Sequence, residues 1–146
     1  MLNTSMFKGE AQESIAFPNE EGGYPLFNQI KEMLIEEIQN QNIPASFYET
    51  QVKSGGMFGT KLPILVISHP IYHNEYFSLC VMVNGQTVSF PLTGESKENT
   101  KANKKEFYTK NGNFIKASFC NPDEFKLQQE IDWEISILRC FNSLVS

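Results

Sequence analysis

Glu130 and Glu134 are the residues of this sequence with the clearest potential for chemistry. They lie four positions apart in a segment whose spacing predicts a helix, and at about 100° per residue both fall between two apolar arcs. The second of these arcs contains Trp133 and Ile137. Because the apolar surface is wider than a single stripe, these four side chains are candidates for contacting a ligand or a partner.

A carboxylate within an apolar surface must be paired, hydrogen-bonded or neutral, because an isolated buried charge is too costly. The favoured interpretation is that both glutamates reach solvent or pair with a lysine from residues 101–116. The first alternative is that Glu134 lines a pocket and has a raised pKa. The second is that the pair lies at a helix–helix interface.

The only two histidines, His69 and His73, lie close to Glu75, and all three are residue types that bind zinc. Pro70 lies between the histidines, so they are not expected to share a helical face, as an H-x-x-x-H zinc site requires. We interpret residues 69–75 as a loop between strands with incidental histidines. The prediction is no metal and no cofactor.

The glycine-rich segment 55–61 is only superficially a phosphate-binding loop. In a P-loop, Gly-Lys is followed by Ser or Thr, whereas here Thr60 precedes Lys61 and a strand is expected to follow. We interpret the segment as a hairpin loop. Met57 and Phe58 at its tip are apolar, and an exposed apolar tip is typical of a contact point.

The three cysteines, Cys80, Cys120 and Cys140, are odd in number and widely spaced, which favours free thiols in a reducing compartment. Residues 1–12 lack the apolar core of a signal peptide, and no stretch approaches the roughly 18 apolar residues of a membrane helix. We therefore expect a cytoplasmic protein. No Ser nucleophile motif is present.

The net charge of −5 is unevenly distributed. Residues 1–50 hold eight acids against two lysines, whereas residues 94–116 hold six lysines against three glutamates. An acidic chain disfavours nucleic acid as a partner, because phosphate contacts need clustered basic residues. Phe107 and Tyr108 lie among the lysines, but a solvated loop is favoured there over a site for single strands.

Two amphipathic helices are predicted near the ends of the chain. The first spans 25–41, where apolar residues recur at steps of three and four. The second begins after Asn121, a good N-cap, and spans 122–144. Residues 1–23 show no clean period, which indicates a mobile N-terminal arm with at most a short strand at 14–17.

The strongest hairpin signal is Asn84-Gly85, a pair typical of a two-residue type I′ turn. Placing the turn there sets Val83 opposite Gln86 and brings the bulky side chains of 77–92 to one face. Pro91 cannot donate a hydrogen bond, so the ladder is expected to end or bend at that residue.

Further strands are predicted at 47–52 and at 62–67, a continuous apolar run that indicates cover on both faces. Residues 94–105 are polar and are interpreted as a loop with room for local helix. A second Asn-Gly pair predicts another hairpin, with Tyr108 opposite Ile115. The expected fold is one α+β domain in the order α-β-β-β-β-β-β-α: an antiparallel meander of five to six strands packed with an N-terminal and a long C-terminal amphipathic helix.

Three classes of function are compatible with this pattern. The leading hypothesis is a non-enzymatic protein-binding or regulatory module whose partner is another protein or a second copy. The alternative is a binder of a small apolar molecule, held between the curved sheet and the C-terminal helix. The third is an enzyme that uses Glu134 or His73 as a general base, for which no nucleophile or second acid can be placed.

Overall fold

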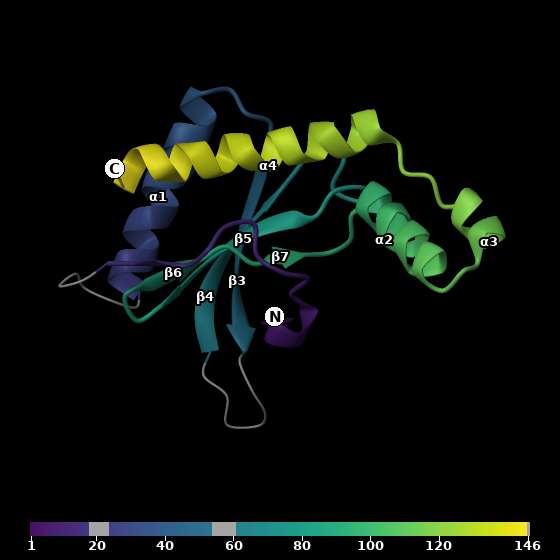
Figure 1. Cartoon of the computed structure of the whole chain (residues 1–146). Helices are drawn as coiled ribbons and strands as arrows, with labels where there is room; N and C mark the ends of the chain where they lie inside the picture. The colour runs from purple at the N-terminus through teal and green to yellow at the C-terminus, as the bar shows by residue number, and fades with distance from the viewer. Residues whose placement is uncertain (18–23, 54–60, 146) are drawn as a thin grey trace.

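The computed structural model describes residues 1–17, 24–53 and 61–145 (Figure 1). Over these ranges the chain forms a mixed α+β fold with a long C-terminal helix. In chain order the elements are β1 (Leu2–Asn3), a short 3-10 helix (Thr4–Met6), β2 (Ile15–Ala16), α1 (Tyr24–Asn40), β3 (Ser46–Lys53), β4 (Lys61–Ser68), β5 (Ser78–Asn84), β6 (Thr87–Ser89), β7 (Leu92–Thr93), α2 (Lys97–Lys110), α3 (Phe114–Ser118) and α4 (Glu124–Val145).

The strands form one open, seven-stranded sheet in the order β1-β3-β4-β5-β6-β2, with β7 paired to β5 after β6 ends. All pairs are antiparallel except β1 with β3. The predicted α+β class is therefore confirmed, but the predicted element order is wrong. Two short strands precede α1, and two further helices lie between β7 and α4.

The hairpin at Asn84-Gly85 is present, and Gly85 has the positive φ of 63° that favours glycine in this turn. The predicted register is wrong by two residues, because Val83 pairs with Val88 instead of Gln86. A shift of two keeps every side chain on its predicted face, since strand side chains alternate with a period of two. The ladder is also interrupted at Pro91, as predicted: β6 ends before it and β7 begins after it.

The main core lies between one face of the sheet and the two long helices, α1 and α4, which both cover that face (Figure 1). Its fully buried side chains include Phe27, Leu34, Ile38, Leu65, Ile67, Leu79, Val81, Val83, Val88, Phe90, Ile137 and Phe141. On the opposite face a smaller cluster of Val52, Ile64, Val66 and Cys80 is covered by Leu2 and Phe7. Residues 1–17 therefore complete the sheet and its second face. The mobility expected for 1–23 stays a prediction.

The helix bounds follow local chemistry closely. The helix predicted at 25–41 is confirmed within one residue at each end. The second predicted helix begins slightly late, at Glu124, because Asp123 and not Asn121 caps it. The Asp123 carboxylate accepts hydrogen bonds from the backbone N–H of Phe125 and of Lys126, both at 3.1 Å.

The second predicted hairpin, with Tyr108 opposite Ile115, is wrong, because its two arms are the helices α2 and α3. Ser96 caps α2 by accepting from the N–H of Asn99 at 3.2 Å, and Gly112, with φ 74°, ends the turn that follows. An Asn-Gly pair serves a helix end as well as a hairpin, since both need left-handed backbone.

The helices α2 and α3 project away from the sheet and beyond the start of α4 (Figure 1). We call residues 97–123 the helical lobe. Within it, α2 buries only Glu98 and α3 buries only Ala117, so the lobe has almost no apolar core of its own. Across the part of the chain that the structure describes, no helix has the length and apolar character needed to cross a membrane.

Candidate functional site

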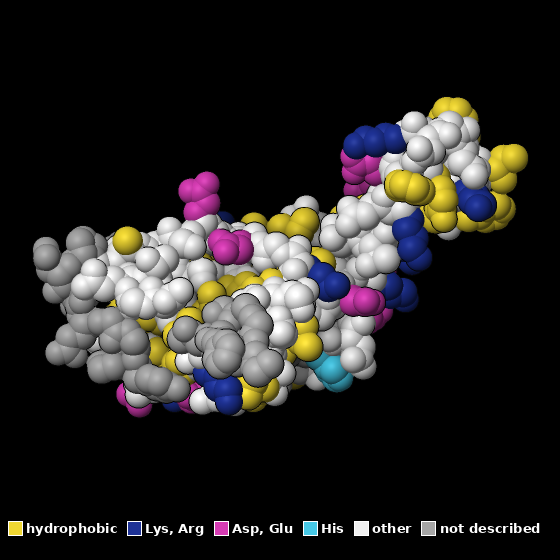
Figure 2. All heavy atoms as spheres, turned by 90° about the horizontal axis from the view of Figure 1, so that it is seen from below, with side chains coloured by type: hydrophobic (Ala, Val, Ile, Leu, Met, Phe, Trp, Pro, Cys, Tyr) yellow, Lys and Arg dark blue, Asp and Glu magenta, His cyan; other side chains and the backbone are white. Residues whose placement is uncertain are grey.

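The end of the helical lobe exposes large apolar side chains instead of burying them. Figure 2 shows hydrophobic side chains gathered there, interspersed with lysines. The exposed fractions are 62% for Phe107, 68% for Phe114, 76% for Ile115, 83% for Phe119 and 73% for Phe125 at the start of α4. We call these five residues the lobe tip. Aromatic residues exposed together mark an interaction surface, because isolated exposed apolar residues are common but clusters are not.

The helices of the lobe are basic, with six lysines against two glutamates in residues 97–118. Lys110 pairs with Glu106 at 2.9 Å, Lys101 pairs with Glu98 at 3.3 Å, and the Lys116 ammonium lies 5.6 Å from the Tyr108 ring centroid. The solvent-exposed pair of Lys110 with Glu106 contributes little to the free energy of folding. The lobe thus presents apolar rings in a positively charged surround.

Two buried glutamates hold the base of the lobe in place, and Glu130 is the one that joins it to the body. Glu130 is 3% exposed. Its Oε2 accepts from the N–H of Phe77 at 2.8 Å, and its Oε1 accepts a short hydrogen bond from the Ser96 hydroxyl, which itself caps α2. One carboxylate therefore joins α4, the residue before β5 and the start of the lobe.

Glu98 is the second, 5% exposed in the first turn of α2. Its Oε1 accepts from the backbone N–H of Asp123 at 2.7 Å and from the Lys101 ammonium at 3.3 Å. The hydrogen bond from Asp123 contributes most to lowering the pKa of Glu98, with a further contribution from Lys101. The beginning and the end of the lobe are therefore tied to each other.

Glu134 lies one helical turn beyond Glu130, and the two carboxyl groups share a hydrogen bond. The Oε1 atom of Glu134 has no hydrogen-bond partner among the described residues. Burial, followed by the charge of Glu130, raises the pKa of Glu134 to about 8. Burial also raises the pKa of Glu130. With a pKa of about 8, Glu134 is mostly protonated at neutral pH, which avoids two adjacent buried charges.

These contacts exclude one of the interpretations for Glu130. The prediction that both reach solvent or pair with a lysine of 101–116 is wrong for Glu130, which is buried and bonded to Ser96 and Phe77. Both carboxyl groups line an open cavity of about 310 Å³ that is also bordered by Lys8. A binding role for Glu130 and Glu134 stays a prediction.

The other sequence candidates on α4 belong to the core. Trp133 is 6% exposed, and its indole N–H donates to the Pro44 carbonyl at 2.7 Å. Its ring packs edge-on against His69, with centroids 5.6 Å apart. Ile137 is 1% exposed. Both side chains are thus inaccessible in this structure, and their role in contacting a partner stays a prediction.

In the segment of residues 69–75, His69 has a structural role. His69 is buried, and its Nδ1 accepts from the backbone N–H of Ile71 and of Tyr72 at 3.1 Å each, while burial lowers its pKa. His73 is exposed, and Glu75 pairs with Lys97 at 3.6 Å. Among the described residues, no three side chains of metal-binding type come together. Met57 and Phe58 lie outside the described residues.

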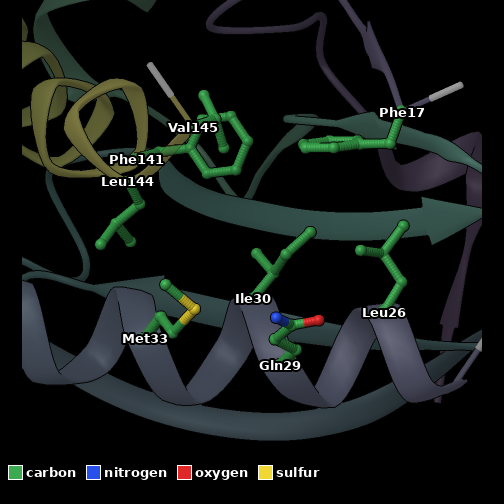
Figure 3. Close-up of a pocket in the computed structure, with 8 residues that line it drawn as sticks. All are labelled: Phe17, Leu26, Gln29, Ile30, Met33, Phe141, Leu144 and Val145. Atoms are coloured by element: carbon green, nitrogen blue, oxygen red, sulfur yellow. The ribbon is translucent and has the colours of Figure 1, made fainter. Parts of the chain in front are cut away.

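An apolar hollow lies at the other end of the molecule, between α1 and the C-terminal end of α4 (Figure 3). Figure 3 shows side chains of α1 facing those of α4 and Phe17 across it. Its volume is about 320 Å³, and Met33 on its rim is 41% exposed. The lining residues are Phe17, Leu26, Gln29, Ile30, Met33, Phe141, Leu144 and Val145. By contrast, the space between the sheet and α4 is filled by core side chains.

Comparison with models of known protein families, with curated proteins and with solved structures finds no match to this chain.

Proposed function

We propose that this protein is a non-enzymatic protein-binding module that contacts its partner through the lobe tip. One observation carries the proposal: five large apolar side chains are exposed on the projecting helical lobe and at the adjoining start of α4. Aromatic residues are enriched at the centres of protein interfaces, where they provide much of the binding free energy. The lobe tip has this composition, and each of its side chains is largely exposed.

The helices of the lobe bury very little apolar surface against the rest of the protein. A helix in a globular protein is stabilised mainly by burying an apolar face, and α2 buries only Glu98. Contact with a partner would supply the missing burial. The positive charge of the lobe favours a partner surface that is acidic as well as apolar, because complementary charge speeds encounter and selects orientation.

The direction of the lobe is set before binding. Glu130 holds the α2 cap through Ser96, and Glu98 holds the residue that precedes α4. Both carboxylates are buried, so their hydrogen bonds are not weakened by competition with water. A surface that is already positioned loses less entropy on binding, which favours affinity.

Removing the lobe tip is expected to abolish capture of a partner. In pull-downs from host lysate, the double variant Phe114→Ser with Phe119→Ser should lose the proteins that the wild type retains. The expected loss is at least about thirtyfold, the effect of about 2 kcal/mol at one strong contact residue. Quantitative mass spectrometry of the retained proteins measures it.

The matched control for this experiment is Ile71→Ser, which removes an apolar side chain that is 73% exposed outside the lobe. Circular dichroism should show that all three proteins are folded, because every altered side chain is exposed. The control should retain the same proteins as the wild type. Equal retention by the wild type, the control and the lobe variant would contradict the proposal.

A second candidate function, binding of a small apolar molecule, is supported by the hollow of Figure 3. Native mass spectrometry of gently purified protein should then show an adduct of constant mass. The variant Met33→Lys should lose it, since a charge at the rim opposes an apolar ligand. A bare polypeptide mass for the wild type would exclude a ligand that co-purifies.

A further inference from the structure

We propose that the partner of the lobe tip is a second copy of this chain, whose hollow between α1 and α4 receives the aromatic side chains. This inference rests on the proposed function of the lobe as a binding surface. The contact is head to tail: each molecule offers its lobe to one neighbour and its hollow to another.

The first argument is position. The lobe lies at the N-terminal end of α4, whereas the hollow lies at its C-terminal end (Figure 1). The 22 residues of α4 separate the two by roughly 33 Å, at about 1.5 Å per helical residue. The lobe of one molecule therefore cannot fill its own hollow, and a contact between the two surfaces must join two molecules.

The second argument is size and chemistry. The hollow measures about 320 Å³ and is lined mainly by aliphatic and aromatic side chains. A cavity of about 150 Å³ holds benzene in a protein interior, so the hollow has room for a phenyl ring. Phe119, 83% exposed, is the most exposed of the lobe-tip residues and the natural one to enter.

The third argument is charge. Glu32 and Glu36 are exposed on α1 within one turn of the lining residue Met33, whereas Lys31 is paired with Glu49 at 2.8 Å. The hollow thus has an acidic flank, and the lobe that would enter it is basic. A symmetric contact of lobe with lobe would instead bring two basic surfaces together, which electrostatics opposes.

A head-to-tail contact has a distinctive consequence for assembly. Each molecule keeps one free lobe and one free hollow after the first contact, so the assembly extends, or closes into a ring, as concentration rises. A symmetric contact would stop at the dimer. Variants that block only one surface separate these outcomes.

Sedimentation velocity on three proteins tests the proposal. The wild type is expected to form dimers and larger species as concentration rises to about 100 µM, a range that detects weak specific association. The variants Phe119→Asp, which places a negative charge on the lobe tip, and Met33→Arg, which places a positive charge on the rim, should each sediment as monomers.

The deciding sample is the equimolar mixture of the two variants. Phe119→Asp keeps an intact hollow and Met33→Arg keeps an intact lobe, so the mixture should form one complex of two chains and nothing larger. That recovery also shows that both variants are folded. A mixture that stays monomeric while the wild type associates would overturn the head-to-tail contact.

A wild type that stays monomeric across the concentration range would also overturn the inference. It would leave the proposed function standing if the lysate proteins are still lost with Phe114→Ser and Phe119→Ser, because the partner would then be a different protein. If those proteins are retained by the lobe variant, the proposed function fails as well. The two failures are therefore distinguishable.

Discussion

Replacing Glu130 with alanine is expected to lower the free energy of unfolding by about 2–4 kcal/mol, because it leaves one buried and one half-buried donor without an acceptor. These donors are the N–H of Phe77 and the hydroxyl of Ser96. Each unsatisfied buried donor costs about 1–3 kcal/mol, and removing the buried charge of Glu130 offsets part of the sum. Urea denaturation followed by the fluorescence of Trp133 measures the loss.

The control for this variant is Gln129→Ala, an exposed neighbour on the same helix, which should change stability by less than about 0.5 kcal/mol. The effect of Glu130→Ala should also be local. Hydrogen exchange of the α2 amides, beginning with the N–H of Asn99, should quicken because the Ser96 cap is loosened. A stability change no larger than that of the control would show that Glu130 does not hold the lobe.

Elements whose apolar residues face the core can be predicted from the local sequence alone. The sequence predicts a helix at 25–41 from its apolar period and a strand at 62–67 from its continuous apolar run, close to the observed Tyr24–Asn40 and Lys61–Ser68. The hairpin was predicted with the correct faces but the wrong register, because the turn occupies Gly85 and Gln86, so that Asn84 pairs with Thr87. Composition alone does not distinguish these two placements of the turn.

For the lobe, the sequence predicts only a loop with room for local helix at 94–105 and a hairpin after it, because these residues lack the apolar period that indicates a helix. The α2 sequence has no apolar stripe, its Phe107 faces solvent, and the Asn-Gly pair that follows α2 is typical of a hairpin as well as of a helix end. One signal was available: Phe107, Phe114, Ile115 and Phe119 lie among lysines in a segment otherwise polar. Apolar residues without a helical or strand period are candidates for a surface that is buried only in a complex.

The glutamate pair was recognisable from sequence, but its partners were not. Two carboxyl groups between apolar arcs must be bonded or neutral, and that requirement is local. Ser96 lies 34 positions from Glu130, and Phe77 lies 53 positions away. No periodicity relates residues so distant, because only the packing of α4 against the end of the sheet brings them together.

Stability should fall as pH rises from about 4.5 to about 8, and Glu134→Gln should remove much of that fall. The unfolded chain releases the Glu134 proton near its ordinary pKa of 4.5, whereas the folded protein keeps it to about 8. Between these values the folded state binds more protons than the unfolded state, so raising the pH favours unfolding. The shift corresponds to at most about 5 kcal/mol, and to about 2–4 kcal/mol after partial solvent screening.

The glutamine variant tests this sign directly. Its amide can donate to Glu130 at every pH, as the protonated Glu134 does, so the variant should match the wild type near pH 4.5 and exceed its stability at pH 9. Urea midpoints measured across that range give the two curves, and Glu124→Gln, in the first turn of the same helix, should follow the wild type. Parallel curves for Glu134→Gln and the wild type would contradict the raised pKa of Glu134 in the folded protein.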